Sequence, residues 1–162
     1  MTKLSFLASV ALLSLVTAVI AGEPAPKPKA EPEPTKATYV ITGLHCRPCT
    51  KTVESSLQKA KGVHSIKVDW DTKKASVEFD EAVLPAQKVA ELIAETPHMM
   101  GRNMHYGGSL LLKIADIRDE DSAKPVEQTL SKVKGVKHVV AYPDQHSVGV
   151  EFDSKGKLTS QD

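Results

Sequence analysis

The sequence repeats itself at a shift of 73 residues, and this repeat limits the folds that the chain can adopt. One set of matches lies in a helical pattern, and a second set lies in a strand pattern further along, at the same shift. Lys51, Val53, Glu54, Leu57 and Gly62 recur as Lys124, Val126, Glu127, Leu130 and Gly135, and Val77 to Asp80 recur as Val150 to Asp153. A repeat of this length indicates two copies of one supersecondary unit.

The first copy has the pattern β-α-β-β-α-β. A strand is predicted at Tyr39 to Thr42, and apolar residues then recur at helical spacing from Pro48 until Gly62. Further strands are predicted at Val63 to Val68, at Ala75 to Phe79 and near Met104 to Leu111, with a second helix between Pro85 and Pro97. This order is typical of the split β-α-β, ferredoxin-like fold. We therefore expect an α+β protein, a ferredoxin-like βαββαβ sandwich in tandem repeat with a truncated second copy.

The second copy lacks the cysteines of the first. Asp119 and Ser122 stand where the shift places the counterparts of Cys46 and Cys49. Residues 155–162 are too few and too polar for a second helix and a fourth strand. A truncated copy would leave an apolar sheet face uncovered. We expect this face to be covered by the first copy or by another chain, in a docked pair or a homo-oligomer.

The first 37 residues predict an export signal and a tether. A short basic start precedes an apolar stretch from Leu4 to Ile20 and small residues at a cleavage position, which favours a cleaved secretory signal over a membrane anchor. Closely spaced prolines among Ala, Lys and Glu then indicate an extended linker. We place the signal peptide at residues 1–21, the linker at 22–37, the first domain at 38–107 and the truncated repeat at 109–162. The mature protein is expected to be periplasmic or secreted.

The only two cysteines of the chain, Cys46 and Cys49, lie between the first predicted strand and the first predicted helix. Their sulfurs should lie beside the unpaired N–H groups and the positive end of that helix, which favours thiolate over thiol. A pair of thiolates is a ligand set for a soft metal ion. In an oxidising compartment the same pair can form a disulfide, which would block metal binding until it is reduced.

Arg47 and Lys51 lie in the cysteine turn and in the first turn of the helix. Positive charge there would lower the pKa of the thiols and offset the negative charge of a bis-thiolate complex. The alternative interpretation is ordinary surface charge.

A second group of metal-binding side chain types lies between His98 and His105. This segment holds three of the four methionines and two of the six histidines. The direction of the predicted elements places it, and the turn from Asp69 to Lys74, at the same end of the fold as the cysteines. Thioether and imidazole groups suit copper, so His98 or Met99 is a candidate third ligand, and His45 is a further candidate beside Cys46. In the alternative, Met100 and Met104 pack into the strand and the histidines face water.

The run Gly43 to Cys49, followed by Val53, Glu54 and Leu57 and then by Gly62, resembles the heavy-metal-associated domain of copper chaperones, metal-exporting ATPases and the exported mercury-binding protein. The resemblance covers about residues 37–106, and Leu44 stands where this family usually has methionine. It implies binding of copper(I), or of Hg(II), Zn(II) or Cd(II), by Cys46 and Cys49. It also implies transfer to a metal donor or acceptor protein, including a membrane metal transporter, through a shared three-coordinate thiolate intermediate. A metal-transport protein of this kind, a metallochaperone, is not an enzyme.

Two other functions use the same residues differently. Cys-Arg-Pro-Cys also resembles the motif of thioredoxin-like thiol-disulfide oxidoreductases, although no tryptophan precedes Cys46. An interaction module with a vestigial or permanently oxidised metal loop is the other alternative, because the second copy has already lost its cysteines. Haem attachment is excluded, since Thr50 stands where that motif needs histidine. The formal net charge of +1 gives no indication of nucleic acid as a partner.

Overall fold

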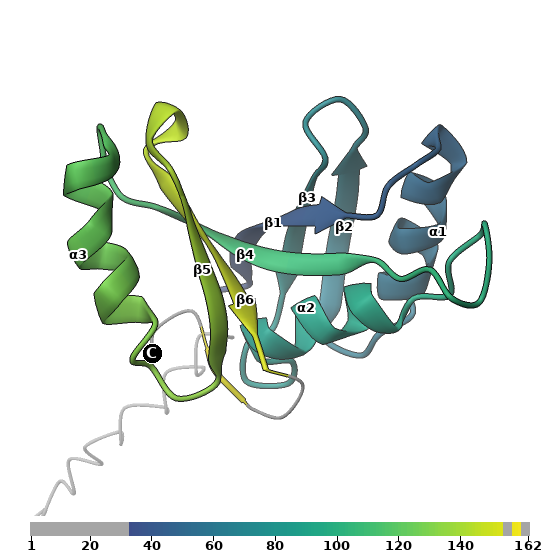
Figure 1. Cartoon of the computed structure of the whole chain (residues 1–162). Coiled ribbons are helices and arrows are strands. Elements are labelled where there is room, and N and C mark those ends of the chain that lie inside the picture. Colours follow the sequence, from purple (N-terminus) through teal and green to yellow (C-terminus); the bar gives the residue numbers. More distant parts are fainter. Residues whose placement is uncertain (1–32, 154–156, 160–162) are drawn as a thin grey trace, which may run out of the picture. The chain divides into compact units, whose positions relative to one another are not determined.

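The computed structural model of the chain describes residues 33–153 and 157–159. In these residues the order of elements is β1 (Thr35–Thr42), α1 (Arg47–Leu57), β2 (Val63–Asp69), β3 (Lys74–Phe79), α2 (Ala86–Glu95), β4 (Gly107–Lys113), α3 (Glu120–Leu130), β5 (Val136–Tyr142), a 3₁₀ turn η1 (Pro143–Gln145) and β6 (Ser147–Phe152) (Figure 1). The predicted signal peptide and most of the predicted linker lie outside the described residues, so both stay predictions.

The strands form one antiparallel sheet in the order β2-β3-β1-β4-β6-β5. Its first four strands, with α1 and α2, have the βαββαβ order and the strand arrangement of the ferredoxin-like fold. The predicted α+β, ferredoxin-like class is therefore confirmed. The remaining strands, β6 and β5, extend the same sheet beyond β4.

The ends of two strands differ from the sequence prediction. β1 begins at Thr35, inside the segment predicted as linker, because the last proline before it is Pro34 and the N–H groups beyond that residue are free to pair with β3. β4 runs from Gly107 to Lys113 and so crosses the predicted boundary between the two domains. The described residues form a single compact unit.

Strand pairing in the two parts of the sheet follows the 73-residue shift. Ala37 of β1 pairs with Val77 of β3, and Leu110 of β4 pairs with Val150 of β6 at that shift. The register irregularity at the start of β2 recurs at the start of β5. The pairing geometry thus agrees with the sequence repeat, while the origin of the second part as a degenerate copy stays a prediction.

The fourth strand of the first unit, β4, also stands where the second unit would have its first strand. Thr38 of β1 pairs with Leu111 of β4, which is its own counterpart at the 73-residue shift. The C-terminal part therefore joins the first part through main-chain pairing between two central strands. The expected docking of side chains on an uncovered face is replaced by a continuous sheet, and a homo-oligomer stays a prediction.

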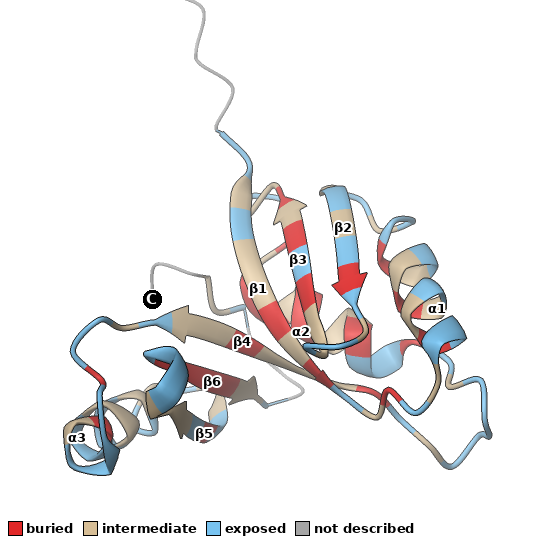
Figure 2. Cartoon of the chain, turned by 90° about the horizontal axis from the view of Figure 1, so that it is seen from above, coloured by how far each residue is buried: buried red, intermediate tan, exposed pale blue. Residues whose placement is uncertain are grey.

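Alternating apolar residues of the sheet face the helices. In the larger core, buried residues of β1 and β3 pack with α1 and α2: Tyr39, Ile41, Val77, Phe79, Val53, Leu57, Val89 and Ile93. In the smaller core, Ala123 of α3 packs with Ile117, Val139 and Val148. Leu110 of the larger core pairs with Val150, which lies on the same face of β6 as Val148 of the smaller core. Both cores, and with them all three helices, therefore lie on one side of the sheet. Figure 2 shows buried residues concentrated in β3, β6 and helix α2, with fewer in β1.

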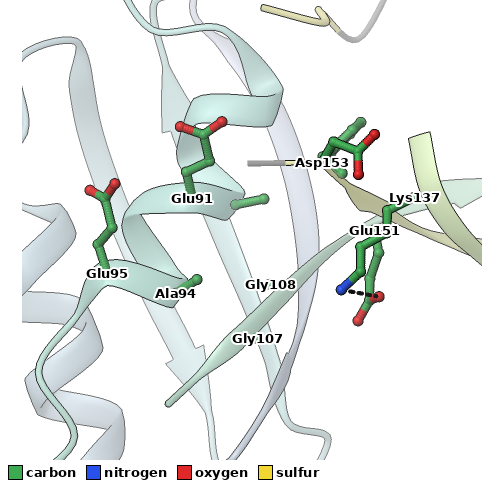
Figure 3. A pocket seen from close by; sticks show the side chains of 10 residues that line it. Glu91, Ala94, Glu95, Gly107, Gly108, Lys137, Glu151 and Asp153 are labelled. Carbon is green, nitrogen blue, oxygen red and sulfur yellow. Dashed lines mark ion pairs between the residues drawn. The ribbon is translucent and has the colours of Figure 1, made fainter. Parts of the chain in front are cut away.

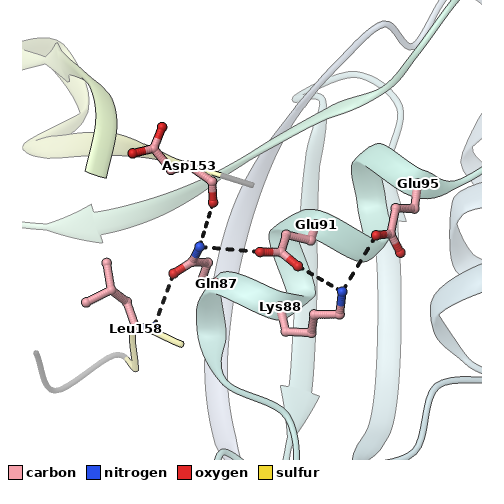
Figure 4. Close-up of polar contacts among 6 residues, drawn as sticks. All are labelled: Gln87, Lys88, Glu91, Glu95, Asp153 and Leu158. Carbon is pink, nitrogen blue, oxygen red and sulfur yellow. Dashed lines mark hydrogen bonds and ion pairs between the residues drawn. The ribbon is translucent and has the colours of Figure 1, made fainter. Parts of the chain in front are cut away.

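Helix α2 is tied to the end of the chain through a fully buried glutamine. Gln87 Nε2 donates to the carbonyl of Asp153 at 2.6 Å, and Gln87 Oε1 accepts the N–H of Leu158 at 3.2 Å (Figure 4). The N–H of Gln87, unpaired within the first turn of α2, donates to the carbonyl of Leu158 at 3.1 Å. The C-terminal segment therefore completes the hydrogen bonding at the start of α2.

We expect Gln87→Leu to lower the free energy of unfolding by about 1–3 kcal/mol, because it leaves the Asp153 carbonyl without its amide donor inside the protein. Urea unfolding followed by circular dichroism measures this loss. Gln145→Leu is the matched control, since Gln145 is an exposed glutamine whose side chain bonds only Lys74 among the described contacts. Equal, small losses in both variants would contradict a structural role for Gln87.

Candidate metal centre

The two cysteines lie at the start of α1, as the sequence predicts. Cys46 is the N-cap residue, with an extended backbone (φ −147°, ψ 148°) and no side-chain cap, and Pro48 occupies the first turn, where its missing N–H costs nothing. The Cys49 N–H donates to the Cys46 carbonyl at 3.0 Å, and the two Cα atoms are 5.3 Å apart. The structure joins the two sulfurs as a disulfide. Both sulfurs thus lie side by side at one helix end.

The two cysteines differ in exposure. Cys49 is fully buried in the larger core together with Leu44, whereas Cys46 is only half-buried and lies between the exposed residues His45 and Arg47. An incoming thiol or metal ion therefore meets Cys46 first. Burial of Leu44 also agrees with a packing role for this residue.

Arg47 faces the turn between β2 and β3. Its guanidinium lies 3.7 Å from the Asp71 carboxylate, and both side chains are largely exposed. This contact confirms that the turn lies at the cysteine end, and it offsets part of the positive charge of Arg47. Lys51 is exposed on α1 and lines a shallow surface groove with Met99. Tuning of the thiols by Arg47 and Lys51 stays a prediction.

His98 also lies at the cysteine end, where it is half-buried. Its Nε2 atom is 2.9 Å from the carbonyl oxygen of Gly43, and its Nδ1 atom accepts the N–H of Met100 at 3.1 Å. The ring centroid lies 4.5 Å from that of Tyr106 and 5.8 Å from that of His45. Both ring nitrogens of His98 are therefore already used within the protein.

The alternative interpretation packs Met100 and Met104 into the strand, but both residues precede β4. Met100 is 60% exposed, and Met99 is 57% exposed. Met104 is half-buried and His105 is exposed. Within the described residues, no three His, Cys, Asp or Glu side chains are grouped so that they could hold a metal ion. Binding of a metal ion by Cys46 and Cys49, with His45, His98 or Met99 as a further ligand, therefore stays a prediction.

A cleft of about 360 Å³ lies away from the cysteines, between α2 and the strands β5 and β6. Its lining includes Glu91, Glu95, Glu151 and Lys137 (Figure 3). Lys137 lies 3.9 Å from Glu151, and Lys88 pairs with both glutamates of α2. Each of these glutamates thus has a lysine partner, and the residues that line the cleft include no sulfur or imidazole for a soft metal ion.

The corresponding helix start in the C-terminal part is closed by a capping box. Asp119 Oδ1 accepts the Ser122 N–H at 2.8 Å, and the Asp119 N–H donates to Ser122 Oγ at 3.1 Å. The hydrogen bonds from Ser122 hold the pKa of Asp119 below its usual value. The Asp119 carboxylate therefore stabilises the folded protein at neutral pH, and this contribution is lost as the pH falls through the lowered pKa. Where α1 begins with two cysteines, α3 begins with a pair of oxygen-bearing side chains that satisfy the helix.

Two residues near the site were not singled out from the sequence. Asp71 could have been found from the direction of the strands, which places the turn after β2 beside Arg47. Tyr106 is 2% exposed beneath His98, and its hydroxyl has no hydrogen-bond partner within the described residues. No sequence signal distinguishes this tyrosine from an ordinary strand residue.

The heavy-metal-associated domain matches residues 38–98. The copper chaperone CopZ of Enterococcus hirae is 32% identical to this chain over 60 residues, which are 37% of this chain and 87% of the chaperone. The chain belongs to the heavy-metal-associated domain family. The periplasmic component of mercuric transport from Serratia marcescens is 33% identical over 54 residues, covering 33% of this chain and 59% of that protein.

The copper-transporting ATPase 1 of Rattus norvegicus is 27% identical over 126 residues, or 76% of this chain, yet the match spans only 8% of the ATPase. Among solved structures, oxidised MerP from Ralstonia metallidurans is similar at 25% identity and a TM-score of 0.39, covering 46% of this chain and 96% of that one. Within the described residues of the present chain, no helix is long and apolar enough to cross a membrane.

Proposed function

We propose that this chain binds one soft metal ion, copper(I) before Hg(II), Zn(II) or Cd(II), through Cys46 and Cys49 and passes it to a partner protein. The observation that carries the proposal is the position of the two sulfurs at one helix end, with Cα atoms 5.3 Å apart, inside a heavy-metal-associated domain. Thiolate ligands select copper(I) and similar ions over Mg²⁺ or Ca²⁺. The names of the relatives, a copper chaperone and a mercuric transport component, support a metal-handling role.

Transfer to a partner follows from the difference in exposure between the two cysteines. A thiolate of the partner enters beside half-buried Cys46 and forms a three-coordinate intermediate, and one sulfur of this chain then leaves the ion. Because few protein ligands hold the ion, this exchange is quick. We infer a metal donor or acceptor protein as partner, including a membrane metal transporter, and a periplasmic or secreted location.

Metal binding requires prior reduction of the disulfide. Two electrons and two protons from a dithiol reductant convert the Cys46–Cys49 disulfide into two thiols, and the reductant leaves as a disulfide. Binding of the metal then releases the thiol protons. We infer that the protein alternates between an oxidised form, which is closed to metal, and a reduced form that is competent to bind it.

The C-terminal part, in our proposal, is a degenerate repeat that keeps the scaffold without the soft-metal site. Asp119 and Ser122 occupy the positions of the two cysteines and are engaged in hydrogen bonds with each other. Aspartate and serine oxygens are poor ligands for copper(I). One chain is therefore expected to bind one ion.

We expect the reduced protein to bind one copper(I) per chain, and the oxidised protein to bind none at that site. Titration in the presence of a coloured copper(I) chelator, under anaerobic conditions and with a free-thiol count, measures both. An insulin reduction assay on the same preparation tests the rival oxidoreductase function. Rapid insulin turnover without metal uptake by the reduced protein would reverse the assignment.

A further inference from the structure

The two nitrogens of His98 identify its tautomer. The backbone N–H of Met100 is only a donor, so Nδ1 of His98 must accept in the 3.1 Å contact between them. The hydrogen of the neutral ring therefore lies on Nε2, which donates to the carbonyl oxygen of Gly43 at 2.9 Å. In this state neither nitrogen has a lone pair available for a metal ion.

The acceptor, Gly43, is held from more than one side. Its φ is +81°, a conformation that favours glycine, and a Cβ atom added there would lie 2.5 Å from the carbonyl oxygen of His105. The His98 ring in turn lies against the buried ring of Tyr106. The peptide that leads from β1 into the cysteine loop is therefore enclosed between His98 and the chain at 105–106.

We propose that His98 is a positioning residue, which holds the cysteine loop through the carbonyl of Gly43 and does not ligate the metal. This inference rests on the proposed function of Cys46 and Cys49. Only Leu44 and His45 lie between Gly43 and Cys46, so the orientation of the Gly43 peptide determines how the loop enters α1. With the loop held, the two thiolates meet the ion at their correct separation, and binding does not have to order the loop first.

The C-terminal part provides an internal comparison. There the Nδ1 atom of His146 lies 2.7 Å from the carbonyl oxygen of Ile117, in the loop that leads into α3. That loop ends at Asp119 and contains no cysteine. At the start of α3, a contact between an imidazole and a carbonyl thus restrains the loop although that loop carries no soft-metal ligand.

Two substitutions separate positioning from ligation. In His98→Gln the side-chain amide supplies an N–H to Gly43 at about the place of Nε2, but it offers no imidazole nitrogen to copper(I). His98→Leu supplies neither an N–H to Gly43 nor an imidazole nitrogen to copper(I). We expect His98→Leu to weaken copper(I) binding by about 10–100-fold, the usual cost of losing an outer-shell partner, and His98→Gln to retain most of the affinity. His105→Leu, at an exposed histidine of the same segment, is the matched control.

A measurement without metal keeps this test independent of the proposed function. In the oxidised protein the disulfide itself restrains the loop, so His98 contributes more to the reduced form. We expect the reduction potential of Cys46–Cys49 to become more negative in His98→Leu and to stay near the wild-type value in His98→Gln. The ¹⁵N shifts of the His98 ring in the wild-type protein should report hydrogen on Nε2.

Each result either supports or overturns the proposal. An equal loss of copper(I) affinity in the Gln and Leu variants, with an unchanged potential, would assign His98 as a third ligand. If both variants keep the wild-type copper(I) affinity and the wild-type reduction potential, His98 neither positions the loop nor ligates the metal. If no variant, and not even the wild-type protein, binds copper(I), the proposed function fails, while the potentials still decide whether His98 holds the loop.

Discussion

Cys46→Ser in the reduced protein is expected to abolish tight copper(I) binding, with a loss of affinity greater than about a hundredfold. This exceeds the 10–100-fold cost of losing an outer-shell partner, because a ligand itself is removed. The serine hydroxyl is a hard oxygen donor and remains protonated at neutral pH, so Cys49 alone would face the ion. Competition with a chelator of known copper(I) affinity measures the loss.

The chain supplies its own control for this experiment. Asp119 occupies the same place at the start of α3 as Cys46 occupies at the start of α1, and it caps a helix instead of holding a metal. Asp119→Ser should therefore leave copper(I) affinity and stoichiometry unchanged. Wild-type affinity in Cys46→Ser would show that the ion is held elsewhere, and the proposed function would fail.

The local sequence predicts most of the elements of the fold. Pro48 at a helix start, Gly62 after a helix and the apolar alternation in β2 and β3 are short-range signals, and each element forms where its signal lies. The 73-residue shift also predicts corresponding pairings in the two parts of the sheet. These features depend on residues close together in the chain or on direct sequence identity.

The sharing of β4 could not be predicted in the same way. β1 and β4 read TKATYVIT and GGSLLLK, and no residue of β4 is identical with its counterpart at the 73-residue shift, so the strand sequence does not identify β4 as a counterpart of β1. Their relation appears only in the register, where Thr38 pairs with Leu111. Long-range strand pairing depends on the assembled sheet and not on the local sequence. From its sequence β4 is the last strand of the first unit, whereas in the sheet it also takes the place of the first strand of the second unit.

In the candidate site, too, some features follow from the local sequence and others depend on contacts between distant residues. The placement of Cys46 and Cys49 follows from the local strand-to-helix transition. The use of His98 depends on the carbonyl of Gly43, 55 residues earlier in the chain, and on a loop whose shape the sequence does not specify. Composition alone therefore groups His98 with the methionines as candidate ligands, whereas the hydrogen bonds of its ring indicate a positioning role.

Phe79→Ala is expected to lower the free energy of unfolding by about 3–5 kcal/mol, because it removes a large aromatic side chain from a packed core and leaves a cavity. Phe79 is fully buried between the sheet and the helices of the larger core. Its counterpart at the 73-residue shift, Phe152, is only half-buried, so the matched variant Phe152→Ala should lose clearly less. Since small domains are stable by about 5–15 kcal/mol in total, the first loss is a large share of what is available.

Urea unfolding of both variants also tests whether the two parts of the sheet are one cooperative unit. Because β4 pairs with both β1 and β6, neither part can unfold without breaking the edge of the other. We therefore expect a single transition by circular dichroism and by Trp70 fluorescence, shifted to lower urea in both variants and further in Phe79→Ala. Two separate transitions, of which Phe79→Ala moves only one, would instead show two domains that fold independently on either side of β4.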